Sequence, residues 1–85
     1  MFSIHKYLLE IEDRQEISMP EGARIIKVGL DTKSQPCIWA IVNTFHKTTD
    51  RIICIYATGQ VNMDIDFDDY VGSFNLLDCT WHVFE

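Results

Sequence analysis

Cys37-Ile38-Trp39-Ala40-Ile41-Val42 decides the fold, because all of its side chains are apolar and most favour β-strands. Successive side chains of a strand point to opposite faces, so both faces of this strand are apolar. Ile52–Ala57 repeats the pattern. An antiparallel sheet with one solvated face would alternate apolar and polar residues. Both segments are therefore predicted to be central strands whose second faces are covered, either by another copy of the chain or by an arm of the chain itself.

The remaining apolar segments are short, follow a period of two and are separated by turn residues. The fold is predicted to be mainly β, a small antiparallel β-sheet or partly open barrel of about six to seven short strands in a single domain over residues 1–85. The predicted strands are Phe2–Leu9, Arg14–Met19, Arg24–Thr32, Gln35–Phe45, Arg51–Ala57, Tyr70–Phe74 and Cys79–Phe84.

Three further segments carry local predictions. Met19–Gly22 is expected to form a type I turn with proline in second position, and Thr48–Asp50 is expected to close another turn. Met63, Ile65 and Phe67 alternate with aspartates, which predicts a half-exposed strand or arm, and Asp66–Gly72 allows one short helical turn. The closing Thr80–Glu85 segment carries Trp81, Val83 and Phe84, so it is expected to be a docked strand rather than a frayed tail.

Composition excludes several functions. A net charge of −6 disfavours general nucleic-acid binding and attraction to anionic membranes. No apolar run approaches the length of a membrane span, and no signal peptide is recognisable, so a cytosolic protein is expected. Cys37, Cys54 and Cys79 are far apart in the sequence, which argues for buried reduced thiols rather than a zinc site or disulfides.

Asp64-Ile65-Asp66-Phe67-Asp68-Asp69 suggests calcium binding, but an EF-hand loop needs glycine and glutamate where this chain has Asp69 and Asn75. No metal or cofactor is therefore expected. The aspartates are interpreted as a solvated strand face or as an acidic patch for a basic partner, formed by Asp64, Asp66, Asp68 and Asp69.

No nucleophile elbow and no phosphate-binding glycine loop occurs, so no catalytic residue is assigned and the protein is not expected to be an enzyme. Arginines open two apolar strands, and a guanidinium beside an aromatic ring suits a phosphorylated ligand and its base. The candidate ligand residues are Arg24, Arg51, Trp39, Tyr56, Tyr70 and His82, with Lys27 as a further cation. The alternatives are solubilising arginines at strand ends and a structural histidine.

Short motifs in this order and spacing resemble a family of small proteins of tailed bacteriophages. The motifs are Lys6-Tyr7, Met19-Pro20-x-Gly22-Ala23, Trp39-Ala40-x-Val42, Thr58-Gly59, Tyr70-Val71-Gly72 and Trp81-His82-Val83-Phe84-Glu85. The resemblance implies a β-rich phage protein made in the cytoplasm of the infected bacterium, and by analogy a role against host defences.

Three functions remain open. The first is a homo-oligomer that sequesters a nucleotide-derived immune signal between subunits without cleaving it. The second is an acidic inhibitor of a host nuclease or CRISPR effector. The third is an accessory virion or regulatory protein. The two-sided apolar strands and aromatic tail favour the first, and the acidic run Asp64–Asp69 favours the second.

Overall fold

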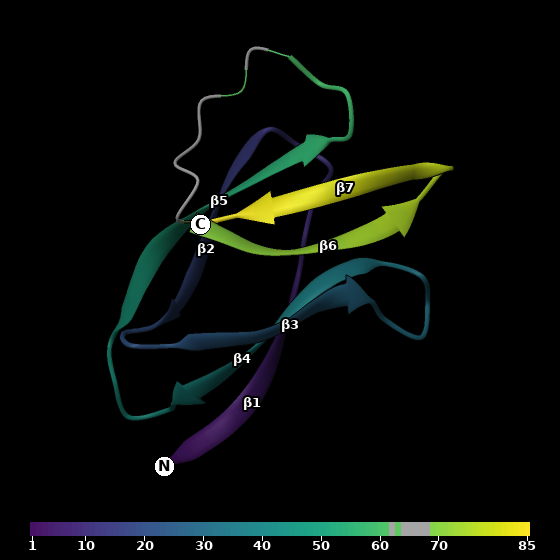
Figure 1. The fold of residues 1–85 in the computed structure, drawn as a ribbon. Helices are drawn as coiled ribbons and strands as arrows, with labels where there is room; N and C mark the ends of the chain where they lie inside the picture. The colour runs from purple at the N-terminus through teal and green to yellow at the C-terminus, as the bar shows by residue number, and fades with distance from the viewer. Residues whose placement is uncertain (62, 64–68) are drawn as a thin grey trace.

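Seven β-strands are described in the computed structural model, which covers residues 1–61, 63 and 69–85. They form a three-stranded sheet of order β1-β4-β3 and a four-stranded sheet of order β2-β5-β7-β6, and every pairing is antiparallel (Figure 1). The mainly β, antiparallel fold is confirmed, with two sheets in place of a closed barrel. The strands are Phe2–Leu8 (β1), Arg14–Pro20 (β2), Arg24–Leu30 (β3), Pro36–Asn43 (β4), Thr48–Ala57 (β5), Tyr70–Leu76 (β6) and Cys79–Phe84 (β7).

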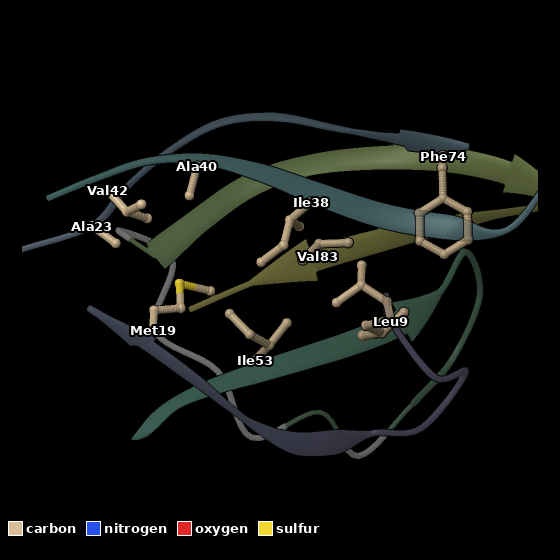
Figure 2. Packing of buried hydrophobic residues seen from close by; sticks show 10 residues of the cluster. Leu9, Met19, Ala23, Ile38, Ala40, Val42, Ile53, Phe74 and Val83 are labelled. Carbon is tan, nitrogen blue, oxygen red and sulfur yellow. The ribbon is translucent and has the colours of Figure 1, made fainter. Parts of the chain in front are cut away.

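The two sheets enclose one hydrophobic cluster (Figure 2). Ile38 of β4, Ile53 of β5 and Val83 of β7 have no exposed surface at all. Each such side chain contributes roughly 1.5–3 kcal/mol of hydrophobic stabilisation. The two segments predicted to be central do occupy interior positions, β4 in one sheet and β5 in the other.

The second faces of these central strands are partly covered within the chain. Cys37 is fully buried and Tyr56 is 6% exposed, whereas Trp39 and Ile41 are half-buried and Ile52 is 38% exposed. Less apolar surface is therefore left for another copy to cover than the sequence pattern suggests. Assembly stays a prediction.

The turn after β2 lies one residue later than predicted. Ala23 donates its amide to the carbonyl of Pro20 at 3.1 Å, so the turn is Pro20–Ala23, with Gly22 in third position at a φ of 82°. Positive φ at the third residue defines a type II turn and suits glycine. The predicted type I turn is wrong because Pro20 remains in the β2–β5 ladder, opposite Thr48.

The turn predicted at Thr48–Asp50 is also wrong. These residues open β5 and pair with the end of β2, and the chain instead reverses at the residues before Thr48, where His46 donates its amide to the Asn43 carbonyl at 3.0 Å. Among Met63, Ile65 and Phe67, only Met63 lies within the described residues. The helical turn allowed for over Asp66–Gly72 lies partly outside them, and its described end from Tyr70 belongs to β6.

The closing segment is confirmed as a docked strand. β7 lies between β5 and β6, and Val83 is fully buried. The indole Nε1 of Trp81 donates to the Leu76 carbonyl at 3.1 Å. Leu77 and Asp78 connect β6 to β7 with φ values of 55° and 57°, which are typical of a two-residue type I′ hairpin turn.

Candidate functional site

A β-bulge in β3 shapes the outer face of the three-stranded sheet. Arg24 pairs with Ile41 and Lys27 with Trp39, while Ile26 is the extra residue between them. Residues three positions apart in a regular strand point to opposite faces, but the bulge brings both cations to the same face. Trp39 and Ile41 point away from the core, opposite to Ile38 and Ala40, so this face is the outer one.

The Lys27 ammonium lies over the Trp39 ring, with its nitrogen 4.8 Å from the ring centroid. This is a cation–π contact. Neither Lys27 nor Arg24 has a carboxylate partner among the described residues, and both are exposed. Two unneutralised cations and an indole are therefore neighbours on a protein whose net charge is −6.

Lys6 of β1 adds a third cation to this outer face, since it pairs with Trp39 on the other side of β4. Its ammonium forms an ion pair with Asp31 at 3.0 Å. The backbone amide of Gln35 donates a hydrogen bond to the Asp31 carboxylate, and this bond, then the Lys6 contact and the Lys33 amide, hold the pKa of Asp31 at about 2. Asp31 in turn raises the pKa of Lys6. Lys6 is thus neutralised locally and held in place.

Apolar side chains surround the cations on this outer face. Phe2 is 75% exposed, Ile4 60%, Leu8 54% and Ile26 45%. The pairing register puts the first three beside Asn43, Ile41 and Cys37 of β4, on the same face as Trp39. We call the surface formed by Phe2, Ile4, Lys6, Leu8, Arg24, Ile26, Lys27, Trp39 and Ile41 the outer face of the β1-β4-β3 sheet.

The opposite side of the molecule carries an aromatic cluster. Phe84 of β7 lies 6.1 Å from Tyr56 and 5.6 Å from Tyr70, measured between ring centroids, and the second contact is edge-to-face. His82 is nearby in β7, where its Nε2 and the Thr58 hydroxyl form a hydrogen bond of 2.7 Å. These residues lie on the outer side of the β5-β7-β6 strands, opposite to the core residue Val83.

The guanidinium of Arg51 is occupied by contacts within the fold, to Glu85 and to the Ala23 carbonyl. It pairs with Ile17, on the core side of β2, and its guanidinium bonds both carboxylate oxygens of Glu85, one of them at 2.6 Å. The same group also donates to the Ala23 carbonyl. The hydrogen bond to Glu85 raises the pKa of Arg51, so the guanidinium stays charged.

The candidate ligand residues thus fall into separate groups. Arg24 and Trp39 share the outer face of the β1-β4-β3 sheet, together with Lys27. Tyr56, Tyr70 and His82 share the other side of the molecule. A pocket containing members of both groups would need two copies of the chain.

Sequence reasoning did not assign Lys6 or Phe84, although the register of β1 and the alternation of β7 place both beside predicted residues. The bulge at Ile26 has no signal in the sequence.

Most of the predicted acidic patch lies outside the residues that the structure describes. Asp64, Asp66 and Asp68 are outside the described residues, and Asp69 is exposed, with its carbonyl accepting a hydrogen bond of 3.0 Å from the Glu85 amide. Within the described ranges, no group of three or more His, Cys, Asp or Glu side chains is arranged to hold a metal ion. The same ranges contain no apolar helix of membrane-spanning length.

Two surface hollows are described in the structure. One surface hollow is lined by Glu21, Gly22 and Phe45–Lys47, and another by Asn75–Thr80. Neither hollow contains Arg24, Lys27, Trp39 or the Tyr56–Phe84–Tyr70 cluster.

No curated protein and no solved structure matches the chain. A family model does match it, over residues 1–85, that is, over its full length. The chain belongs to the family described as "Domain of unknown function (DUF7352)".

Proposed function

We propose that this chain is a non-catalytic anti-defence protein of a bacteriophage, which sequesters a nucleotide-derived immune signal in the cytoplasm of the infected cell. Its binding surface in this proposal is the outer face of the β1-β4-β3 sheet. The phage origin rests on the motif resemblance. The site rests on a single structural observation, the Lys27–Trp39 contact beside Arg24.

The chemistry of this surface fits the ligand class. The indole offers a flat apolar ring on which a base can take the place of the Lys27 ammonium, and stacking of one base on an aromatic side chain contributes about 1–3 kcal/mol. Arg24 presents the donor fork that matches phosphate oxygens, and Lys27 adds a mobile charge. Neither cation has to leave a carboxylate partner among the described residues before it binds phosphate.

The arrangement of the rest of the chain supports the choice of this surface over Arg51. Recruiting Arg51 for a ligand would break its contacts with Glu85 and Ala23. Tyr56 is 6% exposed, whereas Trp39 is half-buried with a cation over its ring. A second copy would complete the surface into the inter-subunit pocket that the sequence predicts.

Titration calorimetry with a panel of cyclic dinucleotides and cyclic ADP-ribose isomers tests the proposal. At least one nucleotide should bind the parent protein, and Arg24→Gln and Lys27→Gln should each weaken binding by about tenfold, as loss of one charge-assisted hydrogen bond predicts. Lys33→Gln is the matched control, because Lys33 lies in the exposed β3–β4 turn and its side chain has no partner among the described residues. Binding that survives both substitutions on the outer face, or no heat from any nucleotide, would overturn the proposal.

A second candidate function is an acidic inhibitor that covers a basic surface of a host nuclease or CRISPR effector. Exposed carboxylates at Glu10, Glu12 and Asp13, in the β1–β2 connection, and at Asp69 favour it. Replacing Asp64, Asp66, Asp68 and Asp69 by Asn should then abolish inhibition, and inhibition should weaken with added salt, because exposed charges are screened over about 8 Å at physiological ionic strength.

A further inference from the structure

β1 is an unprotected edge strand. The two sheets have four edges in the described structure, formed by β1, β3, β2 and β6. β3 and β6 are interrupted by bulges, at Ile26 and Val71. β2 ends in Pro20. Bulges and prolines are the usual protection of an edge strand against pairing with another chain. β1 has neither, and it pairs with β4 in unbroken register from Phe2 to Leu8.

The free backbone groups of β1 can be assigned from the ladder. Leu9 donates its amide to the Pro36 carbonyl at 2.9 Å, and Thr44 donates to the Met1 carbonyl at 2.8 Å. Hydrogen bonding alternates along an antiparallel pair, so the odd-numbered residues of β1 bond β4. The N–H and C=O groups of the even-numbered residues therefore point to the open side, and these residues are Phe2, Ile4, Lys6 and Leu8.

The charge that normally protects such an edge is neutralised here. Lysine on an edge strand discourages pairing by repulsion between like charges. The ammonium of Lys6 is held by Asp31 at 3.0 Å. The other three residues whose backbone groups point to the open edge have apolar, exposed side chains, from 54% at Leu8 to 75% at Phe2. Met1, 72% exposed, and Phe45, 81% exposed, are further exposed apolar residues near the start of the strand.

We propose that β1 pairs antiparallel with β1 of a second copy, about a two-fold axis through His5. This inference goes beyond ligand binding and does not depend on it. In this register all four free-edge residues of each copy meet a free-edge residue of the other, which gives about eight backbone hydrogen bonds. Phe2 lies beside the partner's Leu8, and Lys6 lies beside the partner's Ile4.

Neighbouring registers are less favourable. An axis through Lys6 would leave Phe2 of both copies beyond the partner's Leu8, with no β1 residue opposite it. An axis through Ile4 would leave Leu8 of both copies unpaired. The axis through His5 is the register that uses the whole strand from Phe2 to Leu8.

The dimer would have a continuous six-stranded sheet of order β3-β4-β1-β1-β4-β3. The axis is perpendicular to the sheet, so both outer faces lie on the same side of it. The two central rows across this sheet, related by the axis, each run from Lys27, Trp39 and Lys6 of one copy to the partner's Ile4, the partner's Ile41 and the partner's Arg24. One surface would therefore carry Lys27 and Arg24 of both copies on either side of two central β1 strands, whose side chains on this surface are Phe2, Ile4, Lys6 and Leu8.

Disulfide trapping tests the register. His5 bonds β4 and would form a non-hydrogen-bonded pair with the partner's His5, where Cα atoms lie about 4.5 Å apart, within the range of a disulfide. His5→Cys should give a disulfide-linked dimer under mild oxidation, with peptide mapping placing the bond at position 5 of both chains. Ser3→Cys is the matched control, because Ser3 lies on the same face of β1 but opposite the partner's Tyr7, about 13 Å from its counterpart. Equal trapping of the two variants, or trapping of neither, would overturn the register.

A second variant tests the pairing itself. Ile4→Pro removes an N–H that points to the open edge and is not used in the β1–β4 ladder, so the strand can retain its internal pairing. Sedimentation equilibrium at micromolar concentration should show a dimer for the parent and for Ile4→Val, and a folded monomer for Ile4→Pro. A parent protein that is monomeric throughout the micromolar range would refute the dimer.

Discussion

Arg51 and Glu85, 34 positions apart in the sequence, form a two-point ion pair that ties β5 to the residue following β7. The side chains of both are largely shielded, 22% and 29% exposed. The third contact, from the guanidinium to the Ala23 carbonyl, adds the start of β3. One side chain thus links parts of both sheets.

Arg51→Ala should lower the free energy of unfolding by about 1–3 kcal/mol, because it leaves the Glu85 carboxylate and the Ala23 carbonyl without their donor. Urea unfolding measures this loss. Arg14→Ala is the control, since Arg14 is exposed on β2 and its side chain has no partner among the described residues. Equal stability of the two variants would show that the ion pair contributes nothing.

Stability should depend on pH through Asp31. Hydrogen bonds from Gln35, Lys6 and Lys33 hold its pKa at about 2 in the folded chain, against roughly 3.9 for an unperturbed aspartate. Between these values the unfolded state binds more protons, so the contribution is fully present above about pH 4 and is lost as pH falls toward 2. The urea midpoint of the parent should therefore fall over this window.

The Asp31→Asn variant tests whether Asp31 causes this pH dependence of stability. The amide oxygen still accepts backbone hydrogen bonds but does not titrate, so the stability difference from the parent should be largest above pH 4 and should disappear near pH 2. Glu16→Gln, an exposed carboxylate on β2, serves as the control. A constant difference across the window would exclude Asp31 as the titrating group.

Patterning alone predicted most of the fold. The two-sided apolar strands and the aromatic closing segment identified β4, β5 and β7, because buried strands need apolar residues on both faces. The Pro20–Ala23 turn was displaced by one residue because Pro20 fits both as the last residue of β2 and inside a turn. Local preference cannot distinguish these positions, and the ladder with β5 decides between them.

The candidate site was less predictable. Strict alternation separates Arg24 from Lys27, and only the bulge at Ile26 brings them together. Arg51 and Arg24 look alike in the sequence, since each opens an apolar strand, yet Arg51 meets Glu85 across the sheet and Arg24 meets solvent. Long-range pairing fixes that difference, and a single sequence does not contain it.

Substitutions in the β6–β7 turn should stabilise the fold. Leu77 and Asp78 both have positive φ, a conformation that costs a non-glycine residue about 1 kcal/mol or more, and Leu77 is 80% exposed, so packing offsets little of that cost. Leu77→Asn with Asp78→Gly supplies the residues that a type I′ turn prefers. Thermal unfolding should show a higher Tm for the double variant. A lower Tm would indicate that Leu77 makes a stabilising contact.

Gly72 marks a close approach between the two sheets. A Cβ at this position would lie 3.0 Å from Cβ and Cγ2 of Val28, whose β-branched side chain has little freedom to move. Gly72→Ala should therefore destabilise the fold by about 1–3 kcal/mol through overpacking. Gly29→Ala is the matched control, because its nearest contact is the flexible Lys27 side chain at 3.7 Å. Val28→Ala should lower the free energy of unfolding on its own, but it also removes the side chain that a Cβ at position 72 would meet. In a double-mutant cycle, Gly72→Ala should therefore cost less when position 28 is already alanine than it does in the parent. Additive effects in urea unfolding would show that the sheets can separate slightly at this point without cost, and that the close approach of β3 and β6 does not limit the residue at position 72.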